Sequence, residues 1–460
     1  MTTRLLSIAA MAAASAAAQS NATQPDFRYE FCTVCAPDLP DAIAHGDTVR
    51  LRRHAWTVFA GMTLTDAQSP LPVFLNWRTK QDLIRKPNAA PVGTRDAFFG
   101  MEAPTQLPLV ADLKEVLKNL DAAQLEFVNK ASPKAHIAEP LISKVLFNED
   151  LYQHVRKLKT VDAAGNPIPV TDSTGHIDPA AFCALKKQVE GHSSSVADLE
   201  IPAFPSTAIA VKTAWWPVKA KGLTAVPVWD PESNSPAPNG NSPTAVFPMA
   251  GLWSRWVAVD PGSYSSKPYE RVPDHLGRTQ EVRVVPLSNY FYLTITTQEQ
   301  ADRVRDIVPD LPAPTVGDYV VLVGLHFTTK EIPDWIWATF WWHDRPDVGP
   351  YAGQRPSLVL SPWRNYLMSV SYSMTEPREP DGSPHIAFNP YLEGPLAGGI
   401  TSNCMTCHRR AVWPAKQADR GFTSRTPVSA ADPLFSGRMK LDFIWSLSSV
   451  AMPAGGCPAN

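Results

Sequence analysis

The spacing of apolar side chains divides the chain into two kinds of segment. Up to residue 204, apolar side chains recur three and four positions apart, which is the period of an amphipathic helix. Stretches with this spacing cover 47–59, 110–128, 139–158 and 180–189, and the last of them carries Cys183. We therefore predict that residues 19–204 form a mainly helical region.

After Pro205 the pattern changes to short runs of β-branched and aromatic residues, separated by Gly, Pro and Asp. Such runs are typical of strands. They cover 207–217, 253–259, 290–297, 318–329, 335–342 and 367–373, with one helical segment, 298–307, among them. We expect residues 205–375 to form a central antiparallel β-rich domain, as an open sheet or a sandwich.

Residues 376–460 are rich in loop-forming residues and contain a short helical pattern at 441–450. The 45 prolines of the chain agree with many short elements, because proline cannot donate a backbone hydrogen bond and is excluded from helix interiors. The predicted fold class is α+β: an N-terminal helical region, a central antiparallel β-rich domain and a small loop-rich C-terminal region.

The first residues have the pattern of a secretory signal peptide. Arg4 supplies a positive charge, an alanine-rich apolar run follows, and small residues up to Ala18 form a cleavage site before Gln19. A membrane anchor is the alternative, but the run is short for a membrane span. We assign 1–18 to a signal peptide and expect a periplasmic or secreted protein with no membrane span in the mature chain.

The charge of the chain argues against one class of partner. The net charge is −2, and residues of both signs are spread along the chain without a basic block. Nucleic-acid binding depends on clustered Lys and Arg, so we expect no nucleic-acid partner.

The sequence Cys404-Met-Thr-Cys407-His408 is the attachment motif of a c-type haem. The two thiols add to the two vinyl groups of the porphyrin, and the adjacent histidine donates a ring nitrogen to the iron. Residues 376–460 are therefore predicted to be a c-type haem-binding region with one covalent haem c. Four other cysteines remain, an even number that two disulfides would consume in an oxidising compartment: Cys32, Cys35, Cys183 and Cys457.

Zinc is the main alternative to haem, because Cys32 and Cys35 could join Cys404 and Cys407 in a four-cysteine site. The two pairs lie more than 360 residues apart. The expected oxidising compartment also favours disulfides over zinc thiolates. Haem is therefore the preferred interpretation. Ala36 stands where a second haem motif would need histidine, so a disulfide is preferred for the first pair.

The second axial ligand of the iron stays open at this point. Met439 and Met452 follow the motif by 31 and 44 residues, and His326 lies within the apolar run 320–327. His343 and His385 are weaker candidates. A methionine ligand would raise the reduction potential, a histidine would lower it, and an open position would permit chemistry on a small molecule.

Several segments of the second half carry a family resemblance: 210–215, 323–326, 333–344, 389–393, 402–408 and 441–447. On these segments the chain resembles exported bacterial cytochrome c-like proteins, most of them without an assigned activity. The resemblance covers about residues 205–450 and implies a haem region docked on a β-rich domain in the periplasm. It raises Lys212, His326 and Asp344 as candidate site residues. From the sequence alone, Lys212 reaches solvent or a haem propionate. Relatives often have an acidic residue after the Thr-Phe pair at 339–340; this chain has tryptophans there, so we transfer no polar role to them.

Three functions remain open. The leading hypothesis is a periplasmic monohaem protein that passes single electrons to a redox partner protein. The second is a haem c-dependent oxidoreductase for a small organic or peroxide substrate, because the chain is several times larger than an electron carrier needs. The third is a binding module in which the haem serves as a sensor.

Overall fold

The computed structural model describes residues 38–66, 69–83, 96–103, 141–161, 167–169, 200–230, 250–393, 402–413, 428–429, 432–436 and 438–450, with 171, 178, 180–181, 183 and 415. The predicted signal peptide, the predicted helix at 110–128, Cys32, Cys35, Cys457 and Met452 lie outside these residues. Within them, no helix is long and apolar enough to cross a membrane.

The fold is α+β, as the sequence predicts. The helices of the described part are α3 (Leu39–Ala44), α4 (Thr48–Thr63), α7 (Glu149–Arg156), α9 (Gln298–Ile307), α10 (Pro390–Glu393), α11 (Cys404–Arg409) and α13 (Trp445–Val450). The long strands are β5 (Ile142–Phe147), β8 (Ile209–Val218), β10 (Trp256–Asp260), β11 (Tyr269–Pro273), β12 (Thr279–Pro286), β14 (Tyr319–Thr329), β15 (Ile336–Trp342) and β16 (Tyr366–Tyr372). The short ones are β1 (Thr65–Asp66), β2 (Ser69–Pro72), β3 (Arg78–Thr79), β4 (Met101–Glu102), β6 (Lys159–Val161), β7 (Pro167–Pro169), β9 (Thr224–Pro227), β13 (Tyr292–Thr294), β17 (Val412–Trp413) and β18 (Met439–Lys440).

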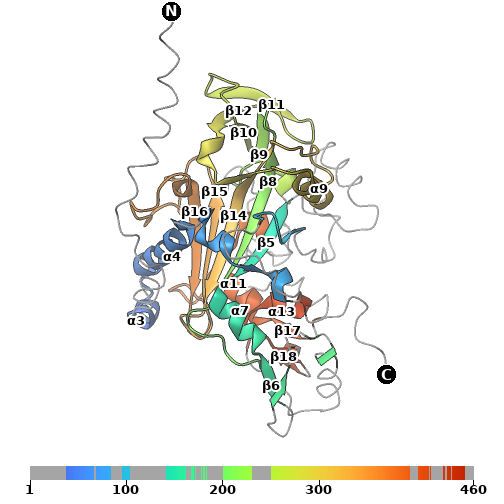
Figure 1. Cartoon of the computed structure of the whole chain (residues 1–460). Helices are drawn as coiled ribbons and strands as arrows, with labels where there is room; N and C mark the ends of the chain where they lie inside the picture. The colour runs from blue at the N-terminus through green and yellow to red at the C-terminus, as the bar shows by residue number, and fades with distance from the viewer. Residues whose placement is uncertain are drawn as a thin grey trace, which may run out of the picture.

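The centre of the molecule is a large antiparallel sheet with the order β16-β15-β14-β8-β5-β3 (Figure 1). β13 pairs with β14, and β4 pairs with β5. Three of its strands were expected almost to the residue, because their runs of Val, Trp and other bulky apolar residues are long and buried on both faces.

A second, smaller sheet with the order β11-β12-β10-β9 lies beyond one end of the large one (Figure 1). The expectation of a purely antiparallel domain is wrong at one place here, because β10 and β12 run parallel. The sequence pattern did not indicate β11 or β12, because exposed polar residues alternate along them and make them less apolar than the strands of the large sheet.

Helix α4 covers one face of the large sheet and confirms the predicted helix at 47–59. The Asp47 side chain accepts a hydrogen bond from the Arg50 N–H and so caps the helix. Trp56 and Phe59 are fully buried, and the Phe59 ring stacks on Phe340 of β15 at 4.1 Å between centroids. Val49 of the same helix is 43% exposed and so does not belong to this buried face.

The predicted helix at 139–158 is wrong in its first half. Residues 142–147 form β5, which pairs with β8, and only 149–156 form a helix, α7. Five of the six β5 side chains are buried. A strand buried on both faces has no alternating pattern, so its apolar spacing matches a helix equally well. One hydrophobic core thus draws on residues from both sides of position 205.

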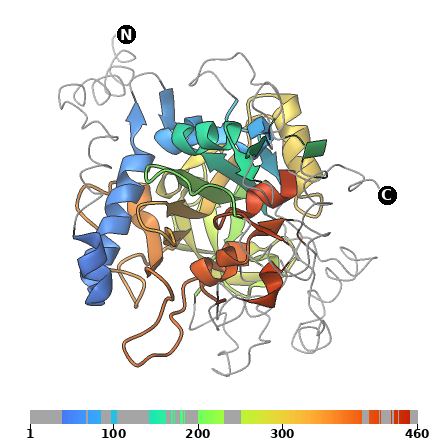
Figure 2. The same cartoon turned by 90° about the horizontal axis from the view of Figure 1, so that it is seen from below.

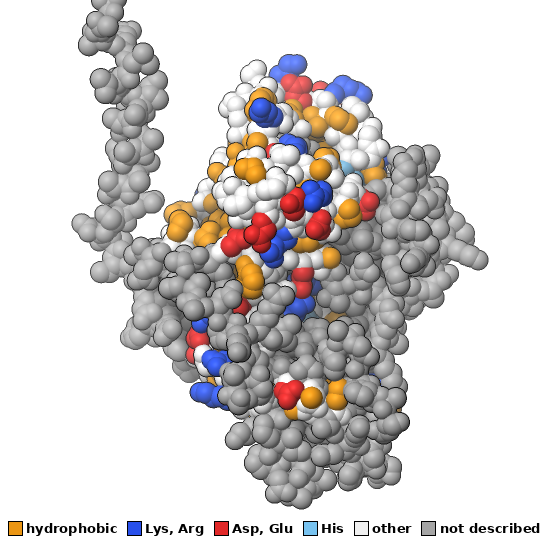
Figure 3. All heavy atoms as spheres, turned by 45° about the vertical axis from the view of Figure 1, so that its right-hand side comes forward, with side chains coloured by type: hydrophobic (Ala, Val, Ile, Leu, Met, Phe, Trp, Pro, Cys, Tyr) orange, Lys and Arg blue, Asp and Glu red, His pale blue; other side chains and the backbone are white. Residues whose placement is uncertain are grey.

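The C-terminal segments gather at the other end of the large sheet, where α7, α11, α13, β17 and β18 lie (Figures 1 and 2). The predicted helix at 441–450 is found from Trp445 onward. Their buried side chains form a second hydrophobic cluster with Trp335 and Trp337 of the sheet region. On the face shown in Figure 3, basic and acidic side chains of the described surface lie intermixed.

Candidate functional site

The motif Cys404–His408 forms the short helix α11, which packs on the face of the large sheet opposite α4. The Asn403 side chain starts the helix by accepting the Met405 N–H at 2.9 Å, and Ser371 of β16 donates to the same oxygen at 2.9 Å. Cys404 and Cys407 are free thiols, and the Cys404 S–H donates to the Ala387 carbonyl at 3.2 Å. The helix therefore presents two unpaired thiols beside the histidine.

The His408 ring is held on one side only. Its Nδ1 donates to the Phe443 carbonyl at 2.8 Å, and the Trp337 ring lies 4.4 Å away between centroids. Within the described residues its Nε2 makes no hydrogen bond. A histidine whose Nδ1–H is bound to a carbonyl keeps its Nε2 lone pair for a metal, which is the arrangement that metal-ligating histidines favour.

The Phe443 carbonyl that binds His408 belongs to a strained turn of the backbone. Asp442 and Phe443 both have positive φ, 41° and 68°, which residues with a side chain rarely adopt. The Asp442 carboxylate holds the strained turn in place because it accepts from three donors, two in the connection between β14 and β15 and one in the segment before β8. These are Lys330 Nζ at 2.6 Å, Trp335 Nε1 at 3.1 Å and the Phe204 N–H at 3.0 Å.

His326 faces His408 from the sheet. The two rings lie 6.3 Å apart between centroids and are nearly perpendicular, at 83°. His326 Nδ1 is buried and makes no hydrogen bond within the described residues, although a carboxylate oxygen of Glu393 lies 3.3 Å from it. The two imidazole rings therefore lie next to each other, with the Glu393 carboxylate beside His326.

Lys212 joins the same cluster, because it pairs with His326 across β8 and β14. Desolvation lowers the pKa of its ammonium, while the nearby Glu393 carboxylate raises it. Cys407 is also close enough to act on the pKa of Lys212. The structure thus brings together Lys212, His326 and the haem motif, as the sequence predicts, and adds Glu393.

Burial also determines the protonation states around the motif. Desolvation raises the pKa of Cys407 to about 11 and that of Cys404 well above its ordinary value. Desolvation, helped by His326, lowers the pKa of His408 to about 3. At neutral pH the site therefore holds thiols and a neutral imidazole, which argues against a reactive thiolate pair.

The other ligand candidates lie in different surroundings. Met439 is fully buried in the cluster that contains Cys404, opposite Trp413 in the β17–β18 pair, and its role as a ligand stays a prediction. His385 uses both ring nitrogens, toward Glu379 and the Val370 carbonyl.

His343 and Asp344 follow β15 at the far end of the sheet. His343 accepts the Arg345 N–H at 2.9 Å, and Asp344 pairs with Arg255 at 2.7 Å. Asp344 therefore lies apart from Lys212 and His326, the other two candidates that the family resemblance raises. It lies roughly 16 Å from them, counting five residues beyond Thr339, the partner of His326 in β15, at about 3.3 Å each.

The residues fit a haem iron. Two imidazoles bound to one metal ion at about 2 Å each have their ring centres roughly 6 Å apart, and His326 and His408 show 6.3 Å. Within the described residues no three His, Cys, Asp or Glu side chains gather as a metal site. A haem iron requires no such group, because the porphyrin supplies four of its ligands.

Of the four cysteines outside the motif, the structure describes only Cys183. Cys183 is disulfide-bonded, as expected for an oxidising compartment. The zinc alternative stays open, because Cys32 and Cys35 lie outside the described residues.

Glu393 and Asp442 are the residues that the sequence reasoning missed. Glu393 stands in one of the segments that carry the family resemblance, but nothing in the sequence pairs it with His326. Asp442 follows a short strand in a loop-rich stretch, where its contacts depend on segments more than 100 residues away.

Comparison with known proteins adds no relative: no family model, no curated protein and no solved structure matches this chain.

Proposed function

We propose that this chain is a periplasmic monohaem c-type cytochrome-like protein that transfers single electrons to a redox partner protein. Cys404 and Cys407 would hold the haem covalently, and His408 and His326 would each supply an imidazole nitrogen to its iron. The observation that carries the proposal is the approach of two imidazole rings, His408 and His326, beside two free thiols.

Each residue has a definite task in this proposal. The Phe443 carbonyl fixes the tautomer of His408, and Trp337 limits the movement of its ring. Glu393 orients His326 from behind, while Lys212 places a cation next to both. When bound, the haem supplies a reversible one-electron centre. Two histidine ligands would give it a lower potential than a histidine and a methionine.

A haem-dependent oxidoreductase is the second candidate. Lys212, His326 and Glu393 are proton-carrying groups that converge opposite His408. Such groups would serve acid–base chemistry on a small substrate if His326 did not bind the iron. The coordination state therefore separates the two candidates.

The first experiment is an absorbance spectrum of the protein made with a c-type haem maturation system. We expect one haem per chain that survives acid-acetone extraction, with a six-coordinate, low-spin spectrum. A high-spin spectrum would favour the oxidoreductase. A protein without a Soret band but with stoichiometric zinc would overturn the haem assignment.

The variant His326→Ala identifies the ligand. We expect it to keep the covalent haem and to become high spin, because it removes one axial nitrogen. His385→Ala is the matched control, since His385 also lies beside the sheet but has both nitrogens engaged, and it should stay low spin. If His326→Ala stays low spin while Met439→Leu or Met452→Leu becomes high spin, a methionine is the ligand instead.

A further inference from the structure

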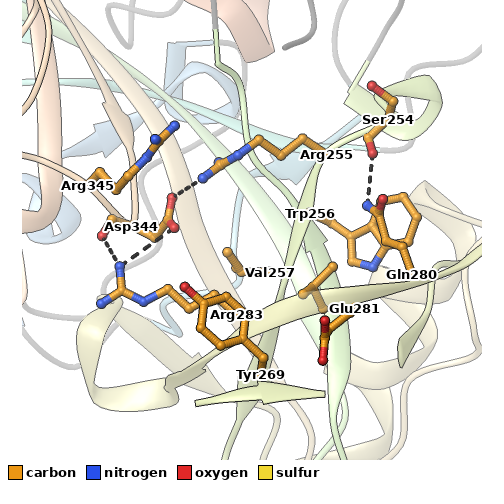
Figure 4. A pocket seen from close by; sticks show the side chains of 11 residues that line it. Ser254, Arg255, Trp256, Val257, Tyr269, Gln280, Glu281, Arg283, Asp344 and Arg345 are labelled. Atoms are coloured by element: carbon orange, nitrogen blue, oxygen red, sulfur yellow. Dashed lines mark hydrogen bonds and ion pairs between the residues drawn. The ribbon is translucent and has the colours of Figure 1, made fainter. Parts of the chain in front are cut away.

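The small sheet and the end of β15 line a cavity of about 470 Å³ that is open to solvent (Figure 4). This volume is in the range of small-molecule sites in proteins. Its main lining residues are Arg255, Val257, Tyr269, Arg283, Asp344 and Arg345. It lies at the other end of the large sheet from the Cys404–His408 motif, so its function is separate from the proposed haem site.

Three arginines from three different segments converge on this cavity. Arg255 directly precedes β10, Arg283 lies on β12 and Arg345 follows β15. Arg283 and Arg345 keep 48% and 47% of their side chains exposed, whereas Arg255 keeps 19%. Figure 4 shows the three guanidiniums on one side of the cavity.

Two buried carboxylates hold the arginines from behind. Asp344 accepts from Arg255 Nη2 at 2.7 Å, and Asp230 pairs with Arg345. Both aspartate side chains are only 4% exposed. Asp344 lines the cavity together with the three arginines, whereas Asp230 is not among the lining residues.

The three guanidiniums at the cavity outnumber the aspartates that contact them. Two aspartates contact three arginines, so these two carboxylates do not compensate one of the three guanidinium charges. Glu281 also lines the cavity, but its carboxylate points away from the arginines in Figure 4. Arg255 Nη1 is buried without a hydrogen-bond partner within the described residues. Guanidiniums with unused N–H groups bind carboxylates well, because two parallel hydrogen bonds can form.

The cavity also has an apolar side. Tyr269 pairs with Arg283 across β11 and β12, and 54% of its surface is exposed. An exposed aromatic ring next to a guanidinium suits a ligand with an apolar body and one charged end.

We propose that this cavity binds a small organic carboxylate, whose carboxylate lies against Arg283 and Arg345 and whose apolar body lies against Tyr269.

Binding of benzoate, measured by calorimetry on the whole protein, tests the proposal. Arg283→Gln removes an exposed guanidinium that lies 3.7 Å from the Asp344 carboxylate, and it leaves Asp344 paired with Arg255. We expect it to weaken benzoate binding about tenfold, the effect of one charge-assisted hydrogen bond. Arg271→Gln is the matched control, because Arg271 is an exposed arginine on β11 outside the cavity. It should leave the affinity unchanged.

Binding of acetate and of methyl phosphate separates the contribution of the apolar body of the ligand from that of its charged group. Weaker binding of acetate than of benzoate supports the apolar contact. Tighter binding of methyl phosphate than of benzoate would show that the cavity prefers a phosphate ester to a carboxylate, and would overturn the proposal. Equal losses in both arginine variants, or no saturation by wild type at the highest soluble benzoate concentration, would overturn the proposal. Thermal shifts of the wild-type protein with each probe at matched ionic strength decide the case if Arg283→Gln does not fold.

Discussion

Asp442 has no contact with the haem motif, yet it determines where the His408 ring points. Its carboxylate is bound by Lys330, Trp335 and the Phe204 N–H, and the next residue offers its carbonyl to His408. Trp335 itself has a positive φ of 61°. Strained residues of this kind persist only where several contacts over-determine them. The ion pair between Asp442 and Lys330 therefore positions the Phe443 carbonyl as well as stabilising the fold.

Asp442→Asn tests this ion pair. The two side chains of the pair are 3% and 9% exposed, so the substitution leaves the Lys330 ammonium buried without its carboxylate. We expect a loss of about 3 kcal/mol in the free energy of unfolding, measured by urea denaturation. Asp381→Asn is the control, since Asp381 is exposed and binds only Ser383, and it should cost less than 1 kcal/mol, roughly the value of a surface contact. Equal losses would contradict the account.

At the level of elements, Asn389 fastens the segment before α10 to the large sheet. Its Nδ2 donates to Thr339 Oγ1 at 2.8 Å and to the Phe340 carbonyl at 2.9 Å. Its Oδ1 accepts the Tyr391 N–H at 3.0 Å. This attachment places Glu393, the last residue of α10, beside His326. Gly324 on β14 leaves room for it, because a Cβ there would stand 3.0 Å from Asn389 Oδ1.

Gly324→Ala should therefore destabilise the protein by about 1–3 kcal/mol, the usual cost of overpacking a buried position. In an Asn389→Ala background the added methyl group meets no amide, so the same substitution should cost at least about 0.5 kcal/mol less. Chemical denaturation of the four proteins in this cycle measures the coupling. Additive losses would show that Gly324 and Asn389 do not interact as described.

At the level of the whole molecule, the two proposed sites occupy opposite ends of one antiparallel sheet. β14 and β15 connect them, and the separation between His326 and Asp344 is roughly 16 Å along the strands. The strands between are buried and close-packed, with few groups that could take two positions. We therefore expect the sites to be independent.

Saturation with benzoate should leave the haem absorption bands of the loaded protein unshifted, relative to sodium chloride at the same ionic strength. This prediction rests on both proposals. A shift of the bands on binding would favour the third hypothesis, in which the β-rich region recognises a ligand and the haem reports it.

Short-range information was enough for a definite part of this fold. The predicted helix at 298–307 is confirmed, and the structure shows a capping box formed by Thr297 and Gln300 at its start. The strands at 318–329, 335–342 and 367–373 follow from long apolar runs between turn residues. The haem motif itself is local, because Cys404, Cys407 and His408 need only one helical turn to stand together.

Tertiary structure alone decided the rest. The run at 142–147 became a strand because β8 offered it a partner, and its apolar spacing is equally compatible with a helix. His326 meets His408, and Glu393 meets His326, through contacts between distant segments that no local pattern encodes. Asp344 was separated from them because the direction of β15 carries it to the opposite end of the sheet. Local propensity and spacing act over a few residues, whereas a site depends on how whole elements pack, and packing is determined by the complete chain.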